Sequence, residues 1–198
     1  MPDFILYAQH GWADNHLGIT KLARSLGTPQ TLIVTPNLGW FNTWLKMAPL
    51  IKKVETMAIA NFNLYPHTPI RIIGHSMGGL IWLEILHRHP QWWQNVHSLV
   101  LVGAPVGGSN LAKTIDPFNL AVGGDLALSR IKIAEAIALK IKTLSIIGDI
   151  DGKSDGTVTV ASTKFNHGKF KILKRIKHPH LKNHPLVAQA IREFWAEL

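Results

Sequence analysis

Short apolar runs alternate with longer amphipathic stretches along nearly the whole chain. Short apolar runs between turn-forming residues are typical of buried strands, and apolar positions three or four residues apart are typical of helices. We expect strands at residues 4–9, 31–35, 70–73, 98–103, 143–147 and 169–176. We expect helices at residues 16–25, 44–60, 78–88 and 185–198. This alternation predicts an α/β fold, in which a mostly parallel sheet of about six strands has helices on both faces.

Residues 106–140 break this rhythm. Their first part contains two Gly-Gly pairs and a proline, and these residues disfavour a continuous helix or strand. We therefore expect a loop-rich insertion above the carboxyl edge of the sheet, where ligands of open α/β sheets bind. A small lid and an ordinary long surface loop both fit this composition. Residues 1–198 are otherwise expected to form a single domain, without room for a large cap domain.

The composition narrows the functional classes. A chain of 198 residues is long enough to bury a core unaided, and the absence of cysteine excludes thiol catalysis, disulfides and cysteine zinc sites. A chain without cysteine is compatible with a reducing compartment. The chain begins with no basic leader or cleavage site, and no apolar stretch reaches membrane-spanning length. We therefore expect a soluble, cytoplasmic protein.

The formal net charge is +9, and much of the excess lies near the carboxyl terminus. No acidic residue occurs between Asp155 and Glu193, whereas lysine and arginine accumulate there. A solvated basic surface explains this asymmetry, with weak contact to an anionic membrane surface as the alternative. Nucleic acid is not expected as a partner, because no groove-reading or base-stacking motif accompanies the charge.

A nucleophile elbow lies between an expected strand and an expected helix. Residues 74–78 read Gly-His-Ser-Met-Gly, and Gly79 follows. In this G-x-S-x-G pattern the serine occupies a strained strand-to-helix turn, and the glycines let the two backbones pass closely while the serine Oγ points outward. The pattern predicts that Ser76 is a nucleophile for acyl transfer.

A serine nucleophile needs backbone amides that bind the developing oxyanion. One amide comes from the residue after the nucleophile, here Met77, and the other from the loop after the first strand. That loop reads His10-Gly11-Trp12, which makes the amide of Trp12 the expected second donor.

The nucleophile also needs a histidine base that a carboxylate orients, in the chain order Ser, Asp or Glu, His. The loop after the expected strand at 143–147 contains three aspartates, Asp149, Asp151 and Asp155. Asp-Gly pairs are also ordinary turn formers, so spacing alone leaves the acid unresolved. We place the acid at Asp155, on a turn backed by the apolar Val158, with Asp149 as the alternative.

The base is expected within residues 177–185, after the last strand, where three histidines occur. His184 directly precedes a proline and suits the start of the final helix. His178 comes first after the strand, where a loop carries an imidazole over the sheet edge, and we prefer it to His180. No carboxylate stands at ligand spacing beside these histidines, so neither a metal nor a cofactor is expected.

With these motifs in place, the chain resembles a compact α/β hydrolase of the lipase and esterase type, similar to the minimal lipases. The resemblance covers nearly the whole chain. Residues 74–79 are similar to the common lipase elbow, and residues 101–109 to the stretch after the next strand in triacylglycerol lipases. His178 with Leu181 resembles the His-x-x-Leu of the family, and residues 154–158 resemble its Asp-Gly-x-Val run.

The chain departs from the family pattern at two points. The two antiparallel strands that open full-length relatives are missing, and Lys177 replaces a glycine that is common before the histidine. The resemblance implies that Ser76, His178 and Asp155 form a triad that cleaves a small-molecule or lipid carboxylic ester through an acyl-enzyme. The alternatives are a thioesterase or acyltransferase on the same scaffold, and a non-catalytic binding protein that keeps the elbow as architecture. A phosphate cradle fits less well, because the Lys-Ser/Thr pair of the P-loop is absent.

Overall fold

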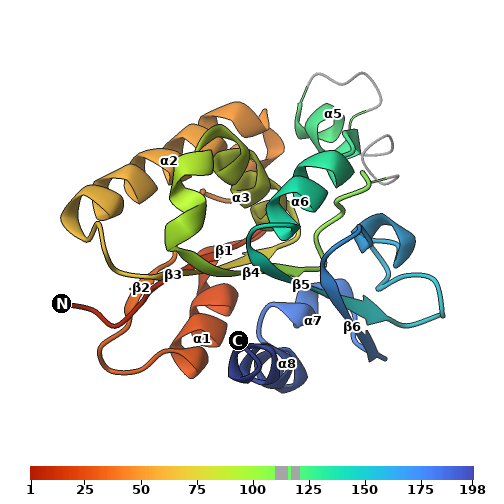
Figure 1. Ribbon diagram of the computed structural model, residues 1–198. Helices are drawn as coiled ribbons and strands as arrows, with labels where there is room; N and C mark the ends of the chain where they lie inside the picture. The colour runs from red at the N-terminus through yellow and green to blue at the C-terminus, as the bar shows by residue number, and fades with distance from the viewer. Residues whose placement is uncertain (110–115, 117–120) are drawn as a thin grey trace.

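The computed structural model describes residues 1–109, 116 and 121–198 (Figure 1). Within these residues six strands form one sheet in the order β2-β1-β3-β4-β5-β6, and every neighbouring pair is parallel. The strands are β1 (Ile5–Gln9), β2 (Leu32–Val34), β3 (Ile70–His75), β4 (Val96–Val102), β5 (Lys142–Asp149) and β6 (Lys169–Lys174). The expected α/β fold with a parallel sheet is confirmed.

Helices cover both faces of the sheet, as Figure 1 shows. Helices α1 (His16–Leu26) and α8 (Pro185–Ala196) lie on one face, and α2 (Met47–Leu64), α3 (Met77–Arg88) and α6 (Ile131–Ala138) lie on the other. The shorter elements are α5 (Val122–Ala127), α7 (His178–Leu181) and the 3₁₀ helices η1 (Phe41–Trp44), η2 (Pro90–Asn95) and η3 (Ala161–Thr163). The four helices expected from the sequence are present, with shifted ends.

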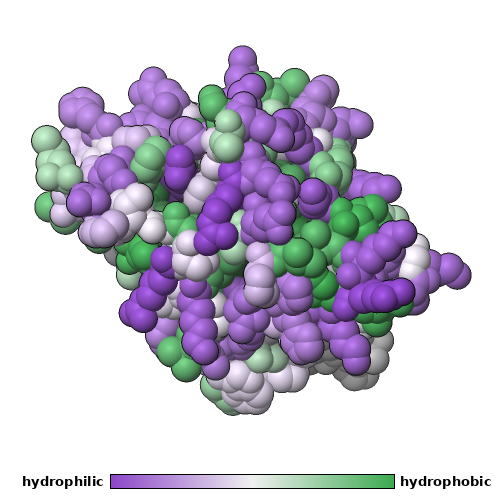
Figure 2. Space-filling model, turned by 90° about the horizontal axis from the view of Figure 1, so that it is seen from below, coloured by the Kyte–Doolittle hydropathy of each residue, from purple (hydrophilic) through white to green (hydrophobic). Residues whose placement is uncertain are grey.

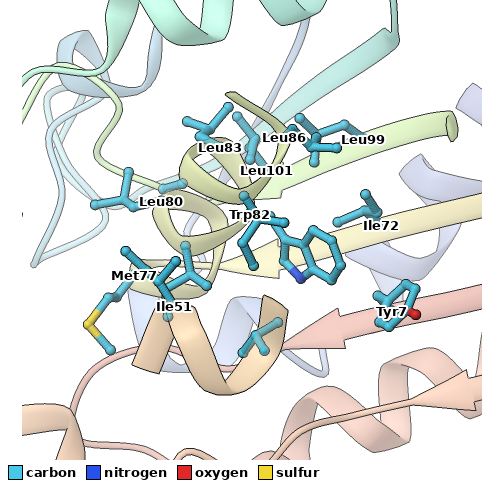
Figure 3. Close-up of a cluster of buried hydrophobic side chains, with 14 of the residues drawn as sticks. Tyr7, Ile51, Ile72, Met77, Leu80, Trp82, Leu83, Leu86, Leu99 and Leu101 are labelled. Carbon is cyan, nitrogen blue, oxygen red and sulfur yellow. The ribbon is translucent and has the colours of Figure 1, made fainter. Parts of the chain in front are cut away.

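Alternate residues of the strands face the two helix layers, because successive side chains of a strand point to opposite sides. Ile5 and Tyr7 of β1 belong to the core beneath α2 and α3, whereas Leu6 and Ala8 belong to the core beneath α1 and α8. Figure 3 shows the first core, where the ring of Trp82 from α3 lies 4.8 Å from the ring of Tyr7. The sheet is thus fixed from both sides and forms a rigid support for the loops at its edge.

The strand order places a crevice at the carboxyl edge of the sheet. From β1 the chain moves outward to β2, and it then crosses back to β3 on the other side of β1. The order therefore reverses between β1 and β3, and open α/β sheets bind ligands where the loops diverge at such a reversal. The loop at residues 10–15 follows β1 and Ser76 follows β3, so both stand beside this crevice.

Residues 106–140 differ from the expected loop-rich insertion. Helices α5 and α6 lie in this region, and α6 packs against α3. The buried Ala134 and Ile137 of α6 are three residues apart, and this helical spacing outweighs the glycine-rich composition of the preceding part. The expected lid falls largely on residues 110–115 and 117–120, which lie outside the described residues.

The longest described helix, α2, has 18 residues and includes Lys52, Lys53 and Glu55. No helix within residues 1–109 and 121–198 combines the length and the apolar character that crossing a bilayer requires. The cytoplasmic location stays a prediction from the sequence.

Candidate active site

Ser76 occupies a strained turn between β3 and α3. Its φ is 54° and its ψ is −126°, a conformation that non-glycine residues rarely adopt. The amide of Ser76 donates to the carbonyl oxygen of Val102 in β4 at 2.8 Å, which fixes the turn to the neighbouring strand. The elbow that the sequence predicts therefore has the local geometry that presents a serine Oγ above a sheet edge.

Two positions of the elbow require glycine, because main-chain atoms of other residues lie directly against them. A Cβ atom on Gly74 would lie 2.4 Å from the Cα of Gly79, and a Cβ atom on Gly78 would lie 2.4 Å from the carbonyl oxygen of Gln9. Both neighbouring atoms belong to the main chain, so neither moves aside without a shift of the backbone. The glycines thus allow α3 to start directly against β1 and β3.

The loop after β1 faces the elbow at contact distance. A Cβ atom on Gly11 would lie 2.8 Å from the Cβ of Ser76 and 3.2 Å from the amide nitrogen of Met77. Among the described residues, neither the Trp12 amide nor the Met77 amide donates to a loop carbonyl or to a side chain. The loop that carries the Trp12 amide therefore lies against the turn that carries the Met77 amide.

His10 fixes the orientation of the peptide unit that carries the Trp12 amide. The Nδ1 atom of this buried imidazole lies 3.0 Å from the carbonyl oxygen of Gly11, and Nε2 lies 3.0 Å from the amide of Leu38, from which it accepts. Burial lowers the pKa of His10, so the ring is neutral and Nδ1–H donates to Gly11. Since a peptide unit is planar, fixing the Gly11 carbonyl also fixes the direction of the Trp12 N–H.

Thr43 of η1 holds the same loop from the outer side. Its buried Oγ1 accepts from the amide of Ala13 at 2.9 Å and donates to the carbonyl of Trp40 at 2.6 Å. Ala13 has a positive φ of 51°, a strained conformation that this bond stabilises. The turn is therefore fixed by His10 on one side and by Thr43 on the other.

Asp155 and His178 form a buried pair at the carboxyl ends of β5 and β6. The Nδ1 of His178 lies 2.6 Å from Oδ2 of Asp155, whose residue is 1% exposed. The other carboxylate oxygen, Oδ1, accepts from the amides of Thr157 at 3.0 Å and Val158 at 2.7 Å. These bonds aim the carboxylate at the ring, so Nδ1 carries the hydrogen and the lone pair of Nε2 is not used by this bond.

The other aspartates of this loop have structural contacts instead. Asp149 accepts from the amide of Gly152 at 2.6 Å, within the turn that ends β5. Asp151 accepts from the amides of Lys153 and Ser154 at 2.8 and 2.7 Å, and these bonds lower the pKa of its carboxyl. Both groups stabilise the turn, whereas Asp155 contacts the imidazole of His178.

The other histidines after β6 also lie apart from this pair. His180 is exposed on α7, and His184 caps α8, where its Nδ1 accepts from the amide of Leu186 at 3.2 Å. No group of three metal-ligating side chains occurs within residues 1–109, 116 and 121–198. Among the three histidines, only His178 is bonded to an acid of the preceding loop.

A second histidine of the site, His75, was not expected from the sequence. Its ring lies 4.9 Å from the ring of His178, and its Nε2 donates to the main-chain carbonyl of His178 at 3.2 Å. Burial keeps the pKa of His75 well below the ordinary value, so this ring is neutral. The available signal was its position inside the elbow, directly before Ser76.

A cavity of about 230 Å³ joins these groups. It is lined by Trp12, Ala13, Asp14, His75, Ser76, Thr157, His178, Pro179 and Lys182. A larger cavity of about 430 Å³ lies at the amino edge of the sheet, beside His67 and His97, far from the elbow. Ser76, His178 and Trp12 line the smaller of these two cavities and not the larger one, so the chemistry of the lining and not the volume points to the candidate site.

An ion pair crosses this cavity and was not expected from the sequence. Lys182, just after α7, donates to the carboxylate of Asp14, which follows the oxyanion turn. The two side chains are 20% and 13% exposed. The pair ties the loop after β1 to the segment that carries His178, and it forms a charged part of the wall.

Comparison with known families finds a match over more than half of the chain. A sequence model of the family described as serine aminopeptidase, S33, matches residues 45–146. This stretch contains the elbow and the strand that follows it, but it ends before the acid and base loops.

Similar solved structures cover nearly the whole chain. The mature lipase BlEst2 of Bacillus licheniformis has a TM-score of 0.75 and is 14% identical, over 98% of this chain and 94% of that one. A lipase-esterase related protein of Clostridium acetobutylicum has a TM-score of 0.64 and is 19% identical, over 98% and 95%. The thioesterase RedJ of Streptomyces coelicolor has a TM-score of 0.60 and is 14% identical, over 100% and 86%. At these identities the likeness concerns the fold.

Curated relatives match only a short stretch. The lysosomal phospholipase A and acyltransferase of Mus musculus is 43% identical over 49 residues, which are 24% of this chain. The protein of the same name from Canis lupus familiaris is 36% identical over 69 residues, or 34% of this chain. The matched stretches span 11% and 16% of those two proteins, so the chain corresponds to a small part of their length.

Proposed function

The chain belongs to the serine aminopeptidase S33 family of α/β hydrolases, and on this premise we propose that it cleaves carboxylic esters, as an esterase or lipase. The observation that carries the proposal is the arrangement around one cavity. Ser76, at a φ of 54°, and His178, hydrogen-bonded to Asp155 at 2.6 Å, both line it. A strained serine beside an oriented imidazole is the arrangement that activates a hydroxyl for attack on a carbonyl.

The proposed reaction proceeds through an acyl-enzyme. Ser76 Oγ attacks the ester carbonyl while Nε2 of His178 takes the hydroxyl proton, and Asp155 stabilises the imidazolium that forms. The amides of Trp12 and Met77 bind the oxyanion of the tetrahedral intermediate. The imidazolium then protonates the leaving alcohol, and the same base activates a water molecule that releases the acid.

The cavity wall favours an ester over a peptide with a free amino terminus. An aminopeptidase must bind the ammonium group of its substrate, for which a carboxylate in the pocket is suited. Among the described lining residues the carboxylate is Asp14, and Lys182 already occupies it. An uncharged ester makes no such demand, and the substrates proposed are therefore small-molecule or lipid esters.

A thioester is the second candidate substrate, because acyl transfer from sulfur uses the same attack and the same oxyanion donors. RedJ, one of the proteins with the same fold, is a thioesterase. An acyl thioester and its oxygen ester differ only in the leaving group. Their kcat/KM ratio therefore separates the two activities.

The test combines covalent labelling with turnover. Wild-type protein is expected to react with a fluorophosphonate probe and to hydrolyse p-nitrophenyl esters from acetate to laurate, with the chain-length profile separating esterase from lipase behaviour. Ser76→Ala should abolish both, whereas Ser25→Ala on the surface of α1 should leave both unchanged. An unlabelled wild-type protein without turnover would favour the non-catalytic binding protein. Faster cleavage of aminoacyl p-nitroanilides than of esters would favour an aminopeptidase.

A further inference from the structure

The 3₁₀ helix η1 and the residues beside it expose an unusual set of large apolar side chains. Trp40, Phe41 and Leu45 are 55%, 70% and 49% exposed. We call these three residues the η1 patch. Single exposed apolar residues are common on soluble proteins, but neighbouring large ones, two of them aromatic, indicate a surface that meets another apolar phase.

The η1 patch is held rigidly despite its exposure. Thr43, within η1, is fully buried and bonded both to the Trp40 carbonyl and to the Ala13 amide. The side chain of Asn42 donates to the carbonyl of Leu38 at 3.2 Å. A fixed apolar surface loses little conformational entropy when it is covered, which favours binding.

The η1 patch is continuous with the wall of the candidate active site. The ring of Trp40 lies 5.6 Å from the ring of Trp44, which in turn lies 4.5 Å from the ring of Trp12. Trp12 lines the cavity that contains Ser76. A surface that covers the η1 patch is therefore brought next to the entrance of the cavity.

Lysine is the prevailing charged residue of the segment that carries the η1 patch. Residues 40–53 contain Lys46, Lys52 and Lys53 and no acidic residue, and the carboxylate of Asp125 accepts from the Met47 amide at 2.8 Å. Lys52 is exposed on the first turns of α2, and Lys53 donates to the carbonyl of Asn37. Tryptophan rings prefer the headgroup region of a bilayer, and nearby lysines attract anionic headgroups. Aromatic and basic side chains together fit a lipid surface better than an apolar protein surface.

The basic carboxyl-terminal quarter is less suited to this role. Its lysines are partly neutralised, because Lys169 pairs with Glu197 and Lys171 pairs with Glu193. Figure 2 shows the face that carries α1 and α8, which is mostly hydrophilic with smaller hydrophobic areas. Electrostatic attraction without insertion of apolar side chains gives only weak binding, so the membrane contact that the sequence offers as an alternative is better placed at η1 than at the carboxyl-terminal quarter.

We propose that the η1 patch docks the protein on an anionic lipid–water interface, and that an ester substrate passes from the lipid into the cavity beside Trp12. The docking does not rest on the proposed chemistry, because neither Ser76 nor His178 takes part in it. It specifies how substrate is presented, namely in an aggregate or a membrane and not as single molecules in solution.

The test measures partition onto vesicles with the Ser76→Ala protein, so that no hydrolysis alters the lipid. Vesicles of phosphatidylcholine with about one fifth phosphatidylglycerol are compared with vesicles of phosphatidylcholine alone by co-sedimentation. The double substitution Phe41→Ser and Leu45→Ser should lower the partition coefficient on the anionic vesicles by about tenfold or more. The matched control, Ile59→Ser with Leu64→Ser on the exposed side of α2, should not lower it.

Three results would overturn the proposal. The first is undiminished vesicle binding by the double variant, and the second is an equal loss in the α2 control. The third is a dimer in sedimentation velocity that the double substitution dissociates, with no vesicle binding by the parent, which would assign the patch to a second copy of the chain. If the double variant misfolds, Phe41→Ser alone answers the question, since this side chain is the most exposed of the three. Vesicle binding together with a lack of ester turnover would refute the proposed function and leave the docking surface standing.

Discussion

His178 and Asp155 are joined twice. The imidazole Nδ1 lies 2.6 Å from the carboxylate, and the main-chain amide of His178 donates to the main-chain carbonyl of Asp155 at 2.9 Å. The second bond sets the distance between the two loops independently of the side chains. Substituting the carboxylate therefore should change the chemistry of the pair more than its position.

Asp155→Asn should retain the fold and lower kcat for p-nitrophenyl butyrate by about four orders of magnitude, because an amide at this position favours the wrong tautomer of His178. Circular dichroism measures whether the fold is retained, and initial-rate assays on the same preparation measure kcat. Asp149→Asn is the matched control, since its carboxylate caps a turn and lies apart from the imidazole. A large loss of kcat in the control and not in Asp155→Asn would move the acid to Asp149.

Thr43→Val should lower ester hydrolysis by about tenfold or more, mainly through kcat. The substitution keeps the shape of the side chain but removes the acceptor of the Ala13 amide, so the oxyanion loop loses one of its two supports. The expected loss of stability is about 1 to 2 kcal/mol, measured by urea unfolding.

Thr163→Val is the control for this loss of stability. Thr163 is equally buried, lies in η3, and donates to the carbonyl three residues before it at 2.8 Å, as Thr43 does. Thr163→Val should lower the free energy of unfolding by a similar amount and leave kcat unchanged. Equal activity in the two variants would contradict a role of Thr43 at the site.

Gly78→Ala should destabilise the protein by about 3 kcal/mol or more, because the added methyl group would meet the Gln9 carbonyl at 2.4 Å and force α3 away from β1. Gly152→Ala is the matched change. It has a φ of +80° but nothing within 4 Å of the added methyl group, so only the backbone strain remains, at about 1 kcal/mol. Thermal unfolding of both variants measures the difference, and similar losses would show that crowding at the elbow is unimportant.

Stability should fall as the pH drops below about 6.5, the ordinary pKa of histidine. Burial lowers the pKa of His10 and of His75 in the fold, so at acidic pH the unfolded chain binds more protons than the folded one. Protonation therefore favours unfolding, and the stabilisation is complete only above the unfolded pKa.

Urea unfolding from about pH 7.5 to about pH 5 measures this dependence. His75→Gln removes one of the histidines whose pKa burial lowers, the others being His10 and His97, and should show a shallower decline than the wild type. A decline of equal steepness would mean that His75 does not contribute to it.

The sheet and most of its helices follow from periodicity, because the inner strands β1, β3, β4 and β5 are buried on both faces and their runs of apolar residues are nearly continuous. The buried run of β4, Val96–Val102, illustrates this, since only one of its residues is not buried. Helix α6 was obscured by the glycines before it, although its buried residues have helical spacing. Local composition there was a poorer guide than the spacing of the apolar residues that pack on α3.

The parts of the candidate site that lie within a short sequence motif were predictable. The elbow and the Gly11 turn are local patterns, and the structure places them in contact. The pair of Asp14 and Lys182 joins positions 168 residues apart, and no local pattern indicates it. His10 bonds to Leu38 and Thr43 bonds to Ala13, and these partners are set by tertiary packing. Contacts of this kind, between residues distant in the sequence, are recognised only from the three-dimensional structure.

Strand β6 is the last strand of the sheet, and one of its edges is unpaired within the described residues. Such an edge is a template on which further strands are able to add, and lysines along it are a common safeguard against this growth. Five of the six residues of β6 are exposed, and three of them are lysines. We therefore expect the lysines of β6 to disfavour aggregation through this edge, and neutralising them should lower the concentration at which the protein precipitates.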